Sequence, residues 1–147
     1  TYRRIFNANN ALYVIPTFPH VMETLHQLHE QGYTLTIASS RSNRSLMEFV
    51  NDMQLNDVIP YVLGAEDVTR AKPHPDPVLQ TLDTFGCKAE DALVVGDTWY
   101  DIEMGRRAGV RTCGVTYGNG SREELMRAGA DFLVDDFGEL LKLASGK

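Results

Sequence analysis

Hydrophobic positions along the chain follow two patterns in turn, one typical of strands and one typical of helices. Short runs rich in apolar and β-branched residues predict strands within residues 33–38, 60–65, 92–95, 110–116 and 132–134. Apolar residues three and four apart predict helices over residues 20–31, 43–53, 75–85, 100–108 and 122–128, and a last helix after Asp136. This alternation predicts an α/β fold with a doubly wound, mostly parallel sheet and helices on both faces.

The predicted elements carry recognisable faces and ends. In the third helix, Val78, Leu79, Leu82 and Phe85 are expected to face inward, and Gly86 is expected to end the helix. Residues 92–95 are wholly apolar, as expected for a strand that is buried on both faces. Ser121 and Glu124 have the spacing of a capping box at the start of a helix.

The first residues differ from the rest in composition. Asn7, Asn9, Asn10 and Pro16 lie close together there, and the chain begins with Thr1. We interpret residues 1–18 as the remnant of a helix followed by a linker. Residues 19–147 are then one domain, because 147 residues leave little room for a second.

Composition narrows the classes of function. The net charge of −6 argues against a nucleic-acid partner, because phosphate backbones bind to basic surfaces. No apolar run is long enough to cross a bilayer, and no signal peptide opens the chain. The two cysteines, Cys87 and Cys113, have no close pairing motif and fit reduced thiols of a cytoplasmic protein. The pattern contains no signal for the oligomeric state.

Polar side chains that could carry chemistry lie where ligands bind in folds of this class, beyond the carboxyl ends of the strands. Ser39 and Ser40 follow one predicted strand, Asp97 follows another, and Lys72 lies in the loop before the third helix. Asp97 and Asp101 are four apart, so a helix would place both carboxylates on the same side. Two carboxylates at a strand end suit Mg²⁺, which takes oxygen ligands and keeps several waters.

Each of these residues also has an ordinary structural interpretation. Asp97 alone could cap the helix that follows it, and Ser39 or Ser40 could cap the helix after them. Lys72 alone could be a solvated lysine in a loop. Together, however, a hydroxyl, a lysine and a carboxylate pair form an anion and metal site, which is what phosphoryl transfer requires.

The order of these residues resembles the haloacid dehalogenase superfamily. Residues 34–40 are similar to its second motif, a strand that ends in Ser or Thr, and residues 71–76 are similar to its third, a Lys-Pro loop. Residues 94–102 are similar to its fourth motif, which is acidic and binds metal. The resemblance covers nearly the whole chain from Pro19 onward and implies a Rossmann-like core.

The resemblance also implies a function and roles for residues. It implies a Mg²⁺-dependent phosphatase in which Ser39 and the Ser40 amide bind the transferring phosphate and Lys72 balances its charge. Asp97 would bind Mg²⁺, and Asp101 would support either the metal or Lys72. Because Lys72 lies in a loop flanked by prolines, we expect its loss to lower turnover more than stability.

One part of the family pattern is missing from this sequence. The superfamily's nucleophile is the first Asp of an Asp-x-Asp motif on the first strand, but the first aspartate here is Asp52. We therefore expect the core to lack its first strand, to leave a gap in the middle of the sheet, and to be inactive as this 147-residue chain. A non-catalytic module that binds phosphate or a protein remains the alternative.

The spacing of the motifs indicates a branch of the superfamily. Only 33 positions separate Ser39 from Lys72, so a cap domain would precede the second motif, as in the branch that contains phosphoglycolate phosphatases. Residues 2–6 would then end the last cap helix. The implied partner is a small phosphorylated metabolite, whose identity the missing cap would largely decide. A two-component receiver domain is excluded, because its acidic residues come first along the chain.

Overall fold

The fold is a single parallel sheet between helices. A computed structural model describes residues 5–8, 21–39, 41–70, 72–116 and 120–145. The strands are β1 (Ile5–Ala8), β2 (Thr34–Ala38), β3 (Tyr61–Leu63), β4 (Ala92–Gly96), β5 (Arg111–Val115) and β6 (Phe132–Val134). The helices are α1 (Val21–Glu30), α2 (Asn43–Asp52), α3 (Asp76–Phe85), α4 (Trp99–Arg107), α5 (Arg122–Ala128) and α6 (Leu140–Ser145).

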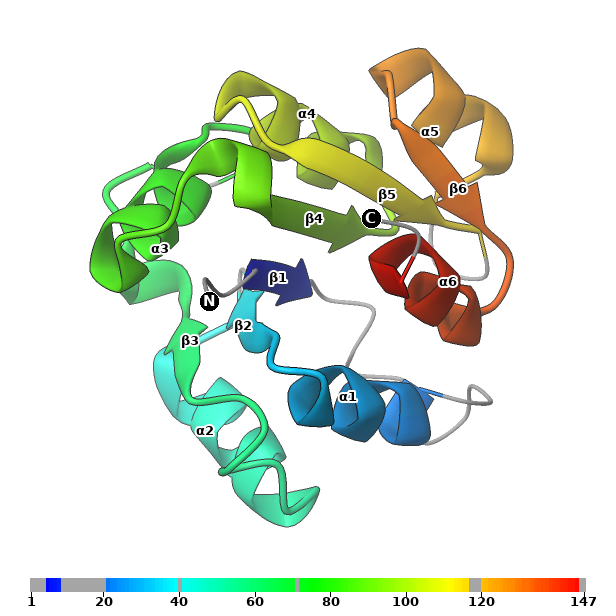
Figure 1. Ribbon diagram of the computed structural model, residues 1–147. Helices are drawn as coiled ribbons and strands as arrows, with labels where there is room; N and C mark the ends of the chain where they lie inside the picture. Colours follow the sequence, from blue (N-terminus) through cyan, green and yellow to red (C-terminus); the bar gives the residue numbers. More distant parts are fainter. Residues whose placement is uncertain (1–4, 9–20, 40, 71, 117–119, 146–147) are drawn as a thin grey trace.

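All neighbouring strands of the sheet are parallel. Their order is β3-β2-β1-β4-β5-β6, so the chain winds outward in both directions from the middle (Figure 1). The predicted doubly wound, mostly parallel sheet is therefore confirmed. Because every strand runs the same way, all the carboxyl ends lie at one edge, where the candidate residues follow β2 and β4.

The middle of the sheet corrects our interpretation of the first residues. The family's first strand, with its Asp-x-Asp motif, is missing from the chain, but its position is taken by Ile5–Ala8. This segment, of which we expected residues 2–6 to be helical, pairs with β2 on one side and β4 on the other. Pairing on both sides satisfies the backbone N–H and C=O groups of β2 and β4 that a gap would leave unpaired. This gain outweighs the weak local preference of the segment for other conformations. The rest of the expected remnant, residues 1–4 and 9–18, lies outside the described residues.

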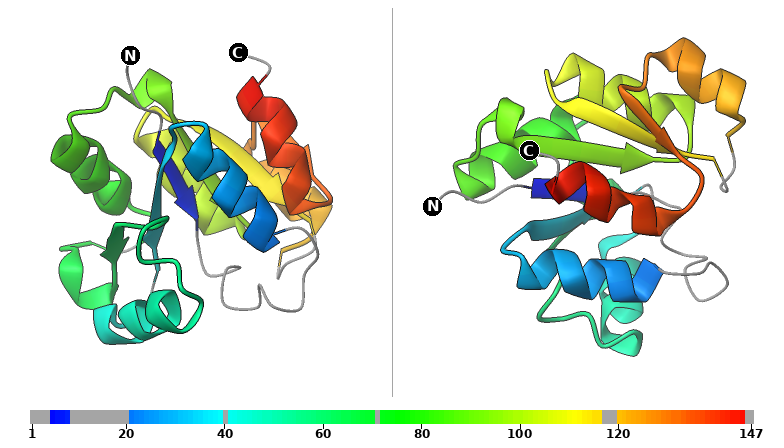
Figure 2. Two further views of the ribbon diagram at one scale, coloured as in Figure 1. Left: turned by 60° about the horizontal axis from the view of Figure 1, so that its bottom comes forward. Right: turned by 45° about the vertical axis from the view of Figure 1, so that its right-hand side comes forward.

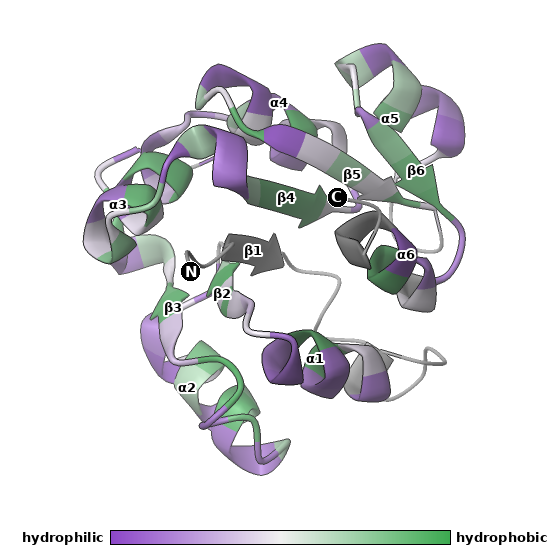
Figure 3. Ribbon diagram, in the orientation of Figure 1, coloured by the Kyte–Doolittle hydropathy of each residue, from purple (hydrophilic) through white to green (hydrophobic). Residues whose placement is uncertain are grey.

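The helices cover the sheet on two sides. Helices α1 and α6 pack against each other on one face, and α3, α4 and α5 lie on the other (Figures 1 and 2). Strand β4 contributes Val95 to the hydrophobic core of the first side and Val94 to that of the second. The expectation that residues 92–95 are buried on both faces is thus confirmed, and Figure 3 shows β4 as a hydrophobic strand in the middle of the sheet.

The predicted helix faces agree with the structure with one exception. Val78 and Leu82 of α3 are buried and Phe85 packs against the same core, but Leu79 is 45% exposed. The spacing of Leu79 places it at the edge of the apolar face of the helix. The sequence does not show how much of that face the rest of the protein covers. Gly86 ends α3 in the left-handed conformation, as predicted.

None of the helices in the described part of the chain is both long and apolar enough to span a bilayer. Neither Cys87 nor Cys113 is in a disulfide, which agrees with the expectation of reduced thiols. Cys113 lies on β5 in the core, and burial, together with the Glu139 carboxylate, raises the pKa of its thiol to about 12. Burial and Asp91 also raise the pKa of Cys87, which is only half-buried.

Gly105 on α4 allows the helix to approach the sheet closely. A Cβ at this position would lie 2.5 Å from Thr112 Cγ2 and 3.1 Å from Val94 Cβ. We predict that Gly105→Ala destabilises the protein by about 1–2 kcal/mol. The helix gains up to about 1 kcal/mol from alanine, but overpacking a core costs about 1–3 kcal/mol. Urea unfolding measures the change.

The matched variant for Gly105→Ala is the double variant with Thr112→Ser. Serine lacks the Cγ2 methyl that the new Cβ would meet, and it keeps the hydroxyl that contacts Asp131. The double variant is expected to be more stable than Gly105→Ala alone. If it were no more stable, the contact with Thr112 would not be the cause of the loss.

The thiols make a second prediction for the fold. Cys113 is 0% exposed, so only Cys87 is expected to react with a disulfide reagent in the native protein. Cys113 should react only at the rate of unfolding. The folded Cys87→Ser variant should therefore not react with the reagent until denaturant is added. Rapid labelling of that variant would contradict the burial of Cys113.

Candidate active site

Ser39 and Lys72 line one cavity beside the carboxyl edge of the sheet, although 33 positions separate them in the sequence. Ser39 follows β2, and Lys72 lies in the loop before α3. Asp97 follows β4, whose partner β1 lies between it and β2. Ser40 is outside the described residues. The structure therefore brings Ser39 and Lys72 together, with Asp97 at the same edge.

The loop that begins at Ser39 is held by backbone hydrogen bonds to the end of β3. The Ser39 amide donates to the Leu63 carbonyl at 3.0 Å, and the Ala65 amide donates to the Arg41 carbonyl at 2.8 Å. The Arg41 amide donates to Ser39 Oγ at 3.1 Å. These bonds fix the position of the Ser39 hydroxyl before any ligand arrives.

Gly64 and Asp67 complete this support. A Cβ on Gly64 would lie 2.3 Å from the Asn43 amide nitrogen, so the two loops approach too closely for any side chain there. The Asp67 carboxylate accepts hydrogen bonds from the Gly64 amide and from Asn43 Nδ2, both at 2.7 Å. Sequence reasoning missed both residues, and the one available signal was a glycine inside the predicted strand segment 60–65, which can mark a close approach of backbone.

Lys72 forms a buried ion pair with Asp101. Its Nζ lies 2.7 Å from Asp101 Oδ1, and the two side chains are only 6% and 1% exposed. The interpretation of Lys72 as a solvated loop lysine is therefore wrong. The expectation that loss of Lys72 lowers turnover more than stability did not anticipate this pair, and a buried carboxylate depends on the charge of its partner.

Asp101 is held in place from its other side by the start of α4. Its Oδ2 accepts hydrogen bonds from the Thr98 hydroxyl at 2.7 Å and from the Thr98 amide at 3.2 Å. Thr98, rather than Asp97, is the N-cap of α4, so Asp97 does not have the capping role that we considered for it. Of the two roles implied for Asp101, the geometry matches support of Lys72.

Asp97 is buried at the end of β4, with 1% of its surface exposed. Its backbone carbonyl accepts a hydrogen bond from the Gly120 amide at 2.8 Å, and a Cβ on Gly120 would lie 2.4 Å from that oxygen. Gly120 thus lies tightly against the backbone of Asp97. Burial of a carboxylate is costly unless a cation or hydrogen-bond donors compensate its charge.

The donor set at this edge is compatible with Mg²⁺ but supplies few protein ligands. The described residues contain no group of three or more His, Cys, Asp or Glu side chains placed to hold a metal ion. Mg²⁺ is often bound by one or two carboxylates, with waters and substrate phosphate as its other ligands. Asp97 fits such a carboxylate, whereas Asp101 is engaged by Lys72 and Thr98.

The aromatic residues Trp99 and Tyr100 also line the cavity. Their rings meet edge to face, with centroids 5.6 Å apart and an interplanar angle of 85°. The Trp99 amide donates to Glu124 Oε2 at 3.2 Å. Glu124 was predicted to complete a capping box with Ser121. Ser121 does accept from the Glu124 amide, but the Glu124 carboxylate binds α4 instead.

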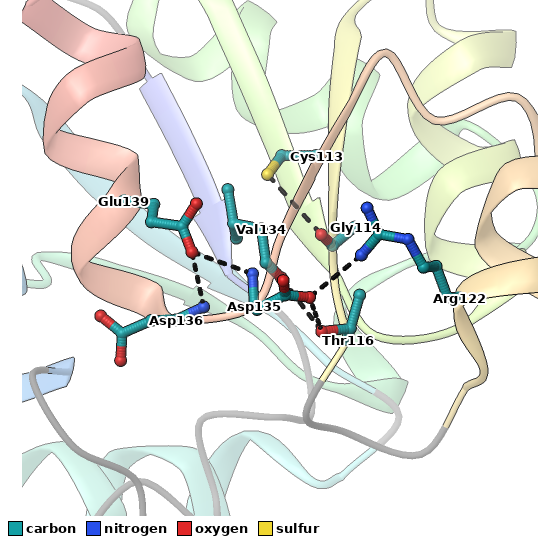
Figure 4. A network of polar contacts seen from close by, with 8 residues as sticks. All are labelled: Cys113, Gly114, Thr116, Arg122, Val134, Asp135, Asp136 and Glu139. Carbon is teal, nitrogen blue, oxygen red and sulfur yellow. Dashed lines mark hydrogen bonds and ion pairs between the residues drawn. The ribbon is translucent and has the colours of Figure 1, made fainter.

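A polar network fixes the ends of β5 and β6 (Figure 4). Asp135 accepts hydrogen bonds from the Thr116 hydroxyl at 2.6 Å and from Arg122 at 3.0 Å. Glu139 accepts from the amides of Asp135 and Asp136, both at 3.1 Å. The Asp136 and Glu139 part of this network confirms the predicted start of the last helix. The network holds the end of β5, after which the chain reaches Gly120, whose amide donates to the Asp97 carbonyl.

Comparison with known proteins agrees with this architecture. The family model described as haloacid dehalogenase-like hydrolase matches residues 1–115. The pyrophosphatase PpaX of Bacillus cereus (strain AH820) is 31% identical over 145 residues, which are 99% of this chain and 67% of that protein. The chain thus spans about two thirds of the length of such relatives.

Solved structures show the same similarity. A predicted phosphoglycolate phosphatase from Haemophilus somnus 129pt matches 91% of this chain and 63% of its own, with a TM-score of 0.81 and 27% identity. A predicted phosphatase from Clostridium acetobutylicum matches 88% of this chain and 60% of its own, with a TM-score of 0.80 and 26% identity. On the fold, the order of the site residues and the matched family model, the chain belongs to the haloacid dehalogenase-like hydrolases.

Proposed function

We propose that this chain is the core of a Mg²⁺-dependent phosphatase that hydrolyses a small phosphomonoester. The observation that carries the proposal is that Lys72, held by its buried ion pair with Asp101, lines the same cavity as Ser39 at the carboxyl edge of the sheet. The similarity to a pyrophosphatase and to two predicted phosphatases supports phosphoryl chemistry. The two cysteines outside disulfides support a cytoplasmic location.

Ser39 and Lys72 would bind the phosphoryl group of the substrate. The Ser39 hydroxyl can donate to one phosphate oxygen, and the Ser40 amide is proposed as a second donor. The Lys72 ammonium would balance negative charge as it builds up on the transferring group, and Asp101 keeps that ammonium in position. Because both side chains are held before substrate binds, little reorganisation is needed during the reaction.

Asp97 is the residue that we propose as a ligand of Mg²⁺. A bound Mg²⁺ would neutralise phosphate oxygens and help to orient the ester. The buried Asp97 carboxylate would supply one hard oxygen ligand for it. Asp101 is proposed to act on this centre through Lys72, rather than as a direct ligand.

The attacking carboxylate is not among the described residues at the site. Asp52, the first aspartate of the chain, lies at the far end of α2, a ten-residue helix that spans about 15 Å from the loop after Ser39. The proposed aspartyl-phosphate mechanism therefore needs an Asp-x-Asp motif that these 147 residues do not contain, on a strand that would take the place of Ile5–Ala8 between β2 and β4. Absence of that motif from the gene product would favour the alternative, a module that binds phosphate without turnover.

We predict that Asp97→Asn weakens Mg²⁺ binding about tenfold or more, because the metal loses an anionic ligand of nearly unchanged shape. Calorimetry of the chain with Mg²⁺ measures the affinity. The exposed carboxylate of Asp83 provides the matched control, since Asp83→Asn makes the same change in charge at a residue that does not line the cavity. Equal Mg²⁺ affinity in the wild type and Asp97→Asn would rule out Asp97 as a ligand.

We predict that Lys72→Met has two separable effects. Loss of the ammonium leaves Asp101 buried without its counter-charge, which should lower the free energy of unfolding by about 3–5 kcal/mol. The loss should also abolish phosphate binding in the presence of Mg²⁺. Urea unfolding measures the first effect, and calorimetry with inorganic phosphate measures the second.

The double variant Lys72→Met with Asp101→Asn separates the two roles. Its neutral amide needs no counter-charge and can still accept a hydrogen bond from Thr98, so most of the lost stability should return. Phosphate binding should remain absent. Restored phosphate binding in the double variant would show that Lys72 acts only on the fold, and unchanged stability of Lys72→Met would show that the pair is dispensable.

A further inference from the structure

The cavity beside Ser39 and Lys72 is larger than a phosphoryl group requires. Its volume is about 240 Å³. A cavity of roughly 150 Å³ is enough to hold benzene. An occupant that places a phosphate against Ser39 and Lys72 therefore leaves space for a further group beside it.

The rest of the cavity is apolar. Of the described residues that line it, Lys72 is the sole charged one, and its ammonium already pairs with Asp101. Leu63, Val68 and Pro77 form part of the remaining wall. None of the residues that form this wall could balance the negative charge of a second phosphate group, which is costly to place against apolar side chains. The lining thus matches an apolar group better than the second half of pyrophosphate.

Trp99 and Tyr100 supply the aromatic part of this wall. Trp99 is 47% exposed and lines the cavity, so its ring is accessible to an occupant. Its backbone is anchored by Glu124, and its ring rests edge to face on Tyr100. The Tyr100 ring lies 5.5 Å from Lys72 Nζ, so the aromatic wall directly adjoins the charged end of the cavity.

We propose that Trp99 and Tyr100 form a subsite for the organic group of the phosphomonoester, and that they select esters with a ring or a compact apolar group. The inference rests on the proposed function for the assignment of the phosphate end. The apolar group would lie against the two rings while its phosphate contacts Ser39 and Lys72. By the same argument, inorganic phosphate and pyrophosphate are poorer ligands of this site.

The test uses non-hydrolysable phosphonates, so that binding is measured without turnover. Phenylphosphonate and methylphosphonate have the same charged group and differ in the ring. Each is titrated into the 147-residue chain with Mg²⁺ in excess, followed by calorimetry and by the emission of Trp99, the one tryptophan of the sequence. Phenylphosphonate is expected to bind about tenfold more tightly or better, because burial of a ring stabilises the complex, and to change the Trp99 emission.

Variants assign the preference to the two rings. Trp99→Ala and Tyr100→Ala should each lower the ratio of the two affinities toward one, and Trp99→Phe should keep most of it because an aromatic face remains. Met126→Ala is the matched control, since Met126 is a large side chain, 60% exposed, that does not line the cavity. The ratio of phenylphosphonate affinity to methylphosphonate affinity in Met126→Ala should equal that of the wild type. Thermal melts verify that each variant is folded.

The outcomes distinguish the subsite from the phosphatase proposal. Equal affinities for the two phosphonates, no detectable binding of phenylphosphonate, or a ratio that survives in both alanine variants would overturn the subsite. Dependence of methylphosphonate binding on Lys72, measured with Lys72→Met in the Asp101→Asn background, reports on the phosphate site alone. Methylphosphonate binding that does not depend on Lys72 would count against the proposed function. Binding that depends on Lys72 but is equally tight for the two phosphonates would remove only the subsite.

Discussion

The buried ion pair between Lys72 and Asp101 is the contact on which the arrangement of the site depends. It joins the loop before α3 to the first turn of α4, two segments that follow different strands. A lysine and an aspartate that are 6% and 1% exposed can remain charged only if each compensates the other and further hydrogen bonds satisfy the remaining atoms. Thr98 supplies those bonds to Asp101, so the same carboxylate caps a helix and holds the cation.

The loops around this pair are held by backbone contacts rather than by large side chains. Gly64 lets the end of β3 lie against the backbone of residues 41–43, and Gly120 packs against the Asp97 carbonyl. In both places the backbone approaches so closely that a Cβ would collide with other backbone atoms. The site is therefore formed where three strand ends and their following loops converge, and its rigidity comes from the sheet beneath it.

This construction separates the binding of phosphate from the choice of substrate. The polar end of the cavity holds the Ser39 hydroxyl and the Lys72 ammonium, which we propose to bind phosphate, and Asp97 lies at the same edge of the sheet. The aromatic wall formed by Trp99 and Tyr100 is a local feature of α4 and lies within reach of the same occupant. Glu124 links this wall to α5, so the position of the wall depends on packing between α4 and α5, and α5 lies outside the motifs.

The sequence by itself determined the fold class and the identities of Ser39, Lys72, Asp97 and Asp101, because strand and helix periods and the order of the motifs are local properties. Tertiary structure decided which of them touch. Local pattern could not show that Asp101 binds Lys72, that Thr98 replaces Asp97 as the cap, or that Glu124 reaches Trp99. Nor could it show that Ile5–Ala8 is a strand, since four residues acquire that conformation only by pairing with β2 and β4 on both sides. Contacts between distant segments depend on how the sheet and helices pack, and a one-dimensional pattern does not record that packing.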